Sequence, residues 1–135
     1  MTNNADIARG LYAAMSDHDI DRMLTMMAED IVDHEMASEV PPGRAGVQQW
    51  FGTLFAGFPD MKATVEDIIC EGDRCACRVR MQGSHQGEFM GIPATRKPVD
   101  IEVFDILRLQ DGMVAEHWGL SDDARMMRQI GAMPG

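Results

Sequence analysis

The sequence predicts an α+β fold in which helices pack on one face of a curved, mainly antiparallel sheet. Apolar residues recur at helical spacing in the first half of the 135-residue chain, and they alternate along extended segments in the second half. Helices that precede a meander of long strands are typical of this class. The chain has no internal repeat, low-complexity tract or linker, so we expect a single domain over residues 1–135.

The first half carries three helical segments and one short strand. Asn3 or Asn4 can cap a first helix. Asp17 or Asp19 starts a second, shorter helix that runs through Met27. The remaining elements expected here are a strand at 31–36 and a helix whose apolar stripe spans 47–55 and which ends at Gly57 and Pro59.

The second half is expected to be mostly sheet. Alternating apolar residues indicate strands at 62–70, 74–86, 99–109 and 113–119. Turn residues separate the first pair and the last pair, and a Gly- and Pro-rich loop separates the middle two strands. Asp122 caps a last helix that stops at Gly131.

Composition restricts the class of partner. The net charge is −10, with 22 acidic and 12 basic residues and no basic run, which argues against nucleic acids and anionic membranes. A hydrophobic, neutral small molecule is the expected ligand. No apolar run reaches the ~18 residues of a membrane helix, and residues 1–6 do not resemble a signal peptide, so a cytoplasmic location is expected.

The three cysteines are expected to be reduced thiols in the core, where free cysteine packs as a small hydrophobe. Cys75 and Cys77 share one face of a strand with His85, so a metal site is the alternative, although C-x-C spacing indicates one only weakly.

Asp105 is the strongest candidate for a functional residue. Side chains alternate between the two faces of a strand, so Asp105 shares a face with five aliphatic residues and should point into the core. These residues are Val99, Ile101, Val103, Leu107 and Leu109. A buried carboxyl group must find hydrogen-bond partners or keep its proton. Such a residue indicates chemistry rather than packing.

The turn after Asp105 determines which residue faces it. A three-residue loop at 110–112 places Asp105 opposite His117, which is the register we favour. A two-residue turn at 111–112 instead places Asp105 opposite Trp118 and turns His117 outward.

Two further histidines are expected to point inward by strand parity. His34 shares its side with Val32 and Met36, whereas Asp33 and Glu35 share theirs with Ile31; His85 lies on the inner face of its strand. Either histidine alone is more simply a satisfied core residue, but with Asp105 and His117 they suggest a polar site in an apolar cavity. A three-histidine metal site is less favoured because no two histidines have close ligand spacing, and we expect no metal.

The chain resembles the SnoaL-like polyketide cyclase family, whose fold is that of the ketosteroid isomerases (a cystatin-like fold). The motifs that carry the resemblance are VEDII (65–69), EGDR (71–74), G-x-H-x-GEF-x-GIP (83–93), D-I-x-R-x-x-DG (105–112), EHW (116–118) and MM-x-QIG (126–131). The resemblance implies a cone-shaped barrel around a deep apolar pocket, often in a homodimer. It also implies that Asp105 is the general acid/base of an intramolecular aldol ring closure without any cofactor. Steroid isomerases of this fold have a base carboxylate at the position of His34, so steroid isomerisation is not expected.

The expected function is therefore acid/base ring closure on a hydrophobic carbonyl compound such as a polyketide ester. Asp105 would transfer the protons, His117 would tune or relay them, and His34 and His85 would orient the substrate. Candidate pocket walls are Tyr12, Trp50, Phe51 and Phe89, for which plain core packing is the alternative. The competing functions are a non-catalytic ligand-binding protein and an isomerase or hydrolase of a small metabolite.

Overall fold

The computed structural model describes residues 3–35 and 40–133. Within these residues the chain forms four helices and one five-stranded sheet, which confirms the predicted α+β class. The elements in chain order are α1 (Asn4–Ser16), α2 (Ile20–Thr25), β1 (Met27–Asp33), α3 (Arg44–Gly57), β2 (Lys62–Glu71), β3 (Arg74–Ser84), β4 (Pro98–Gln110), β5 (Met113–Ser121) and α4 (Asp123–Gln129).

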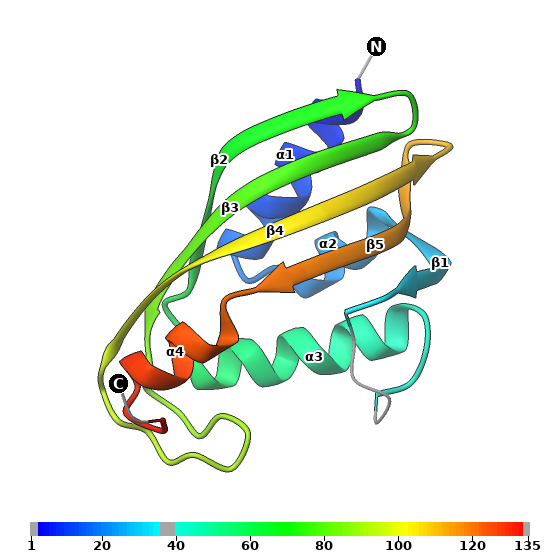
Figure 1. The fold of residues 1–135 in the computed structure, drawn as a ribbon. Helices are drawn as coiled ribbons and strands as arrows, with labels where there is room; N and C mark the ends of the chain where they lie inside the picture. Colours follow the sequence, from blue (N-terminus) through cyan, green and yellow to red (C-terminus); the bar gives the residue numbers. More distant parts are fainter. Residues whose placement is uncertain (1–2, 36–39, 134–135) are drawn as a thin grey trace.

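The sheet has the strand order β1-β5-β4-β3-β2 and is curled rather than closed. β2 to β5 form an antiparallel meander, and β1 adds to β5 in parallel. The helices α1, α2 and α3 lie on one side of the curved sheet, and α4 covers the end where β4 bends (Figure 1). No helix among the described residues is long and apolar enough to cross a membrane.

Short polar side chains begin three of the helices. Asn3, Asp19 and Asp122 each accept a hydrogen bond from a backbone N–H three residues further on, which satisfies one of the free donors of the first turn. The predicted second helix ends earlier than expected, at Thr25, and Met27 begins the first strand instead. Met36, the predicted end of that strand, lies outside the described residues.

The alternation predicted for β4 is confirmed. Its five inward aliphatic residues are each at most 6 % exposed, and Asp105, on the same parity, is 8 % exposed. Phe104 and Ile106, on the other parity, face outward and are exposed. The core therefore lies between this inner face and the helices.

The hairpin between β4 and β5 differs from both predicted registers. Asp111 and Gly112 both have positive φ (53° and 77°), as the two central residues of a type I′ turn do. The register then shifts, because Leu109 pairs with Val114 while Arg108 pairs with Glu116. The extra residue is a β-bulge, which returns the following side chains of β5 to the opposite face.

The prediction of three reduced cysteines is wrong. Cys70 and Cys75 are directly opposed at the turn end of the β2–β3 hairpin and form a disulfide. Cys77 is the buried free cysteine of the described residues. The thiol of Cys75 is thus not available to the Cys-His metal site considered as an alternative.

Candidate active site

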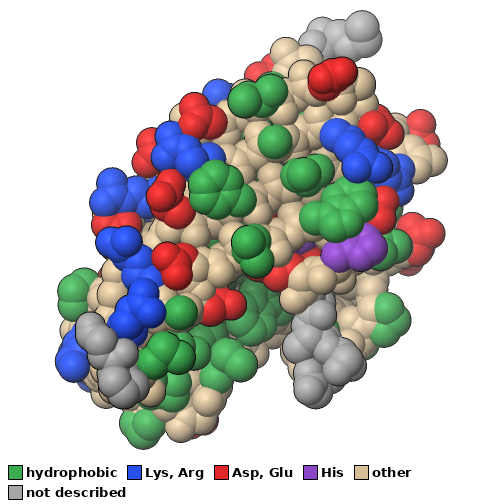
Figure 2. Space-filling view, in the orientation of Figure 1, with side chains coloured by type: hydrophobic (Ala, Val, Ile, Leu, Met, Phe, Trp, Pro, Cys, Tyr) green, Lys and Arg blue, Asp and Glu red, His purple; other side chains and the backbone are tan. Residues whose placement is uncertain are grey.

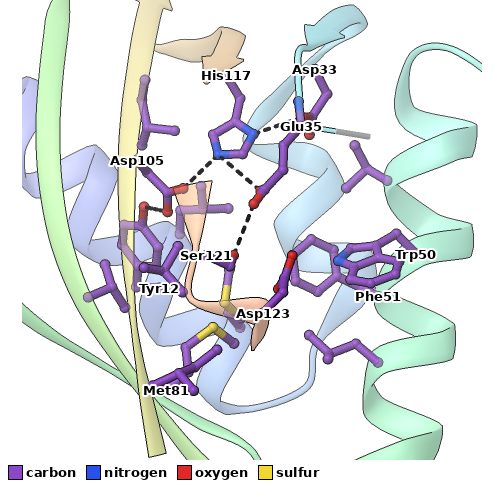
Figure 3. A pocket seen from close by; sticks show the side chains of 18 of the residues that line it. Tyr12, Asp33, Glu35, Trp50, Phe51, Met81, Asp105, His117, Ser121 and Asp123 are labelled. Atoms are coloured by element: carbon purple, nitrogen blue, oxygen red, sulfur yellow. Dashed lines mark hydrogen bonds and ion pairs between the residues drawn. The ribbon is translucent and has the colours of Figure 1, made fainter. Parts of the chain in front are cut away.

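A cavity of about 340 Å³ lies between the inner face of the sheet and the helices. This volume falls in the range of small-molecule binding sites. Most of the lining is aliphatic or thioether side chain, including Leu11, Met15, Val47, Leu54, Ile101, Val103, Leu107 and Met126. A group of polar side chains faces the cavity from β1, β4 and β5 (Figure 3).

Asp105 belongs to that polar group and has both carboxylate oxygens hydrogen-bonded. The Tyr12 hydroxyl of α1 donates to Oδ2 at 2.6 Å. His117 Nε2, from β5, lies 2.8 Å from Oδ1. Burial and the negative charge of Asp105 hold the pKa of Tyr12 well above its usual value, so the hydroxyl keeps its proton and remains a donor.

His117 lies between two carboxylates. Its Nδ1 is 2.9 Å from Asp33 Oδ1, on the side opposite Asp105. Burial by itself lowers the pKa of His117, but the hydrogen bonds to Asp105 and Asp33 and the charges of both carboxylates outweigh burial and raise this pKa to about 10. His117 is therefore an imidazolium at neutral pH, and both ring nitrogens donate.

Glu35 faces the same space from the segment that follows β1. Its Oε2 accepts a hydrogen bond from Ser121 Oγ at 3.0 Å, and its Oε1 lies 4.0 Å from His117 Nε2. Burial raises the pKa of Glu35 against the opposing effects of His117 and Ser121. At the cavity edge, burial also raises the pKa of Asp123.

Gly119 allows these groups to meet. It is the residue of β5 directly opposite Asp105. A Cβ atom there would lie 2.7 Å from Asp105 Oδ1, 2.7 Å from Glu35 Oε1 and 2.8 Å from His117 Cε1. The missing side chain therefore leaves the space into which His117, two residues earlier on the same strand, extends its ring towards Asp105.

The contact predicted between Asp105 and His117 exists, although the two residues do not oppose each other in the ladder. Leu107 is the partner of His117. The bulge turns His117 inward, and the diagonal distance across the ladder is short enough for an imidazole to span.

The prediction that His34 points into the cavity is wrong. It stacks on Trp118 with ring centroids 4.9 Å apart, and its Nε2 is 2.7 Å from Glu116 Oε2 on the outer side of the sheet. The inner parity of this segment is that of Ile31, which is 4 % exposed, whereas Val32 is 49 % exposed.

His85 is inward and fully buried, as predicted, but it does not line the cavity. Its ring stacks on Phe58, and its Nδ1 accepts from the backbone N–H of Thr95. His85 thus lies at the base of the loop 86–97 and behind the cavity wall, so it does not reach the space a substrate would occupy.

The four aromatic residues predicted as pocket walls all line the cavity. Trp50 and Phe51 project from α3 on the side facing the polar group (Figure 3). Phe89, from the loop 86–97, meets the Trp50 ring edge-on at a centroid distance of 6.0 Å. Tyr12 differs from the other three, because its hydroxyl is a hydrogen-bond donor to Asp105.

Sequence reasoning missed Asp33, Glu35, Ser121 and Asp123. A signal for the first two was present, since both share the parity of Ile31. The other face of this strand carries Val32, His34 and Met36, and its two apolar residues make it look more like the buried face. Nothing in the sequence places Ser121 against a glutamate 86 residues away.

Glu35, Asp105 and His117 each offer one ligand atom within 4.8 Å of the other two, a spacing compatible with a metal ion. A metal would have to displace the proton of an imidazolium that already bonds two carboxylates. The donor set therefore suits a proton-transfer group better than a metal site.

Other proteins of known structure have the same fold. TsrD from Streptomyces laurentii superimposes with a TM-score of 0.88 over 98% of this chain and 100% of its own, at 24% identity, which shows the fold alone. IdmH from Streptomyces antibioticus, described as "a putative polyketide cyclase", has a TM-score of 0.84 at 36% identity, covering 96% of this chain and 99% of its own. AclR from Streptomyces galilaeus, described as "a putative hydroxylase", has a TM-score of 0.87 at 27% identity, covering 97% of this chain and 82% of its own.

No curated protein is significantly similar in sequence to this chain. The family model of the SnoaL-like polyketide cyclases matches residues 5–130, nearly the whole chain. With the curled α+β sheet and the apolar cavity around Asp105, this match shows that the chain belongs to the SnoaL-like polyketide cyclase family.

Proposed function

We propose that this protein is a cofactor-independent enzyme that closes a ring in a hydrophobic carbonyl compound, such as a polyketide ester, by an intramolecular aldol reaction. The single observation that carries the proposal is the buried Asp105 carboxylate, which faces an apolar cavity and is held by Tyr12 and His117. Acid/base catalysis by one positioned group contributes about 10²–10⁴-fold in rate.

In this mechanism Asp105 removes a proton from the carbon next to a carbonyl group. Each of its oxygens accepts one hydrogen bond from the protein and keeps a lone pair for the substrate. His117 acts as a fixed positive charge and not as a proton acceptor, because its ring is already fully protonated. The Tyr12 hydroxyl fixes the orientation of the carboxylate.

The charges around the cavity favour a neutral substrate. Four carboxyl groups line it (Asp33, Glu35, Asp105 and Asp123), while His117 is the positive side chain of the described lining. A substrate that carries an ionised carboxylate would be repelled in this low-dielectric space, whereas an ester would not. The aromatic rings of Trp50 and Phe51 offer flat apolar surface for a cyclic product.

The proposal is tested with 1-phenylhexane-1,5-dione, a neutral diketone that can undergo aldol closure. Exchange of its α-protons in D₂O, followed by ¹H NMR, reports proton abstraction alone. We expect Asp105→Asn to reduce enzyme-dependent exchange at least about 100-fold. Asp100→Asn is the matched control, because Asp100 is on the same strand but pairs with Arg80 on the outer face.

Equal exchange by wild type and Asp105→Asn would refute the role of Asp105. A wild-type protein that binds the diketone but does not accelerate its exchange would instead indicate the non-catalytic binding function.

We further propose that the protein forms a homodimer through the outer face of the sheet. Phe104, Ile106 and Leu120, which we call the apolar patch, are 55 %, 40 % and 76 % exposed there, and Phe104 and Leu120 are partners in the β4–β5 ladder. Figure 2 shows hydrophobic side chains distributed over this face between backbone and neutral residues. Arginines alternate with carboxylates around this patch, for example in the pair Arg78–Glu102. The face is thus close to neutral although the chain carries a net charge of −10, so two copies can meet there with little repulsion.

Light scattering after size-exclusion chromatography tests this proposal. We expect a dimer for the wild type and a monomer for Leu120→Glu, with the same circular dichroism spectrum. A monomeric wild type, or a dimeric Leu120→Glu variant, would contradict the proposed interface.

A further inference from the structure

Glu35 and Asp105 present two carboxyl groups to the same part of the cavity. One oxygen of each lies within 4.8 Å of the other, and Gly119 leaves the space between them open. Glu35 comes from the segment after β1 and Asp105 from the middle of β4, so the curled sheet brings together residues 70 positions apart in the chain.

The two carboxyl groups differ in their hydrogen bonds. Both oxygens of Asp105 are occupied, by Tyr12 and His117. Glu35 uses only Oε2, which accepts from Ser121, whereas Oε1 has no hydrogen-bond partner among the described residues. The distance of 4.0 Å from Oε1 to His117 Nε2 is too long for a hydrogen bond.

We propose that Glu35 is a second proton-transfer residue, which donates a proton to the carbonyl oxygen of the substrate while Asp105 removes one from carbon. This inference rests on the proposed function and divides between two residues the two proton transfers that the aldol reaction requires.

The atoms and electrons of the step balance without a co-reactant. Asp105 takes the proton from the α-carbon, and the C–H electron pair forms the enolate. The enolate carbon bonds to the second carbonyl carbon, whose π electrons move to oxygen. That oxygen takes the proton of Glu35, which leaves a β-hydroxyketone, a protonated Asp105 and an ionised Glu35.

The short distance between the two carboxyl groups suits an intramolecular reaction. The carbon that loses a proton and the carbonyl carbon it attacks must approach to about 3–3.5 Å. Two proton carriers on one wall can therefore serve both centres at once. The proton then returns from Asp105 to Glu35 across a gap that one water molecule can bridge.

His117 is the other candidate for the proton donor, but its geometry is unfavourable. Its two N–H groups point at Asp33 and Asp105, so donation to substrate would break one of these bonds. The resulting neutral ring would leave two buried carboxylates uncompensated.

The surroundings of Glu35 favour its protonated form. Burial is the largest effect and raises the pKa, and the carboxylates of Asp105 on β4 and Asp33 on β1 raise it further. His117 and Ser121 on β5 oppose this rise but do not cancel it. A carboxyl group whose pKa lies closer to neutrality is better suited to donate and regain a proton.

The same diketone separates the two roles, because α-proton exchange needs only the base whereas ring closure also needs the acid. We expect Glu35→Gln to keep α-proton exchange close to the wild-type rate and to lose ring closure at least about 100-fold. Asp105→Asn should lose both. Glu71→Gln, a change at an exposed position at the end of β2, should lose neither.

The pH profile gives a readout that a merely structural role would not move. Wild-type ring closure should fall as rising pH ionises Glu35, and the residual closure of Glu35→Gln should lack this limb. In ¹³C NMR of protein labelled at glutamate carboxyl carbons, Glu35 should titrate above the ordinary range of a glutamate, with Glu35→Gln for the assignment.

Ring closure by Glu35→Gln at the wild-type rate, or titration of Glu35 within the ordinary range of a glutamate, would overturn the role of Glu35 and leave that of Asp105 intact. A wild type that accelerates neither exchange nor closure would instead overturn the proposed function, and the role of Glu35 with it.

Discussion

The charge on His117 should make the stability of the protein depend on pH. The pKa of His117 rises from 6.5 in the unfolded chain to about 10 in the fold. At about 1.4 kcal/mol for each pH unit, this difference of 3.5 corresponds to about 5 kcal/mol of net stabilisation of the charged ring, in which the attraction of Asp105 and Asp33 outweighs the cost of burial. The His117 side chain is only 15% exposed, so solvent screens this interaction little.

The sign of this pH dependence follows from the coupling between proton binding and folding. A group whose pKa is raised by folding stabilises the fold fully below its unfolded pKa, and this contribution is lost as pH rises towards the folded pKa. We therefore expect the free energy of unfolding to fall by about 2 kcal/mol between pH 6.5 and 8, and by nearly the full amount by pH 10.

Urea unfolding at pH 6, 8 and 9.5 measures this effect, with His117→Gln as the reference. The variant is needed because other groups also disfavour high pH: burial raises the pKa of Cys77 to about 11 and, with the charge of Asp105, that of Tyr12. These groups remain in both proteins, so the difference between the two curves isolates His117. Curves that stay parallel from pH 6 to 9.5 would refute the imidazolium between two carboxylates.

Two further substitutions test the scaffold of the site. Gly119→Ala should move the carboxyl ends of Asp105 and Glu35. This displacement should lower the pKa of His117 and reduce α-proton exchange at least about tenfold. An unchanged NMR titration of His117 would be inconsistent with the close packing around Gly119. Cys70→Ser should lower the free energy of unfolding by up to about 2 kcal/mol, because the disulfide closes a short loop. A urea midpoint equal to that of the wild type would show that the disulfide contributes nothing.

The sequence was sufficient to predict the fold class and the main catalytic candidate. Strand parity is a local property, and the β4 run of five aliphatic residues around Asp105 is long enough to fix which face is buried. The aromatic lining from Trp50, Phe51 and Phe89 could also be predicted, because helical periodicity and a glycine-rich loop identify these segments.

The register of the β4–β5 hairpin and the orientation of the edge strand β1 could not be predicted from the sequence. The bulge after Arg108 depends on how β5 packs, and no local residue pattern predicts it. β1 is an edge strand with mixed residues on both faces, so parity favoured His34 where packing selects Asp33 and Glu35. The disulfide could not be predicted because free cysteine also packs as a small hydrophobe, and because the pairing that opposes Cys70 to Cys75 across the β2–β3 hairpin depends on the register of the two strands.

The protonation of the His117 ring at pH 8 decides whether an imidazolium holds the Asp105 carboxylate in the cavity. The ¹⁵N chemical shifts of its ring nitrogens can be measured after selective histidine labelling, with His117→Gln for assignment. We expect both nitrogens to carry a proton at this pH, where an ordinary histidine is neutral. A single protonated nitrogen would mean that no imidazolium holds the Asp105 carboxylate in the cavity, and it would contradict the mechanism proposed for this site.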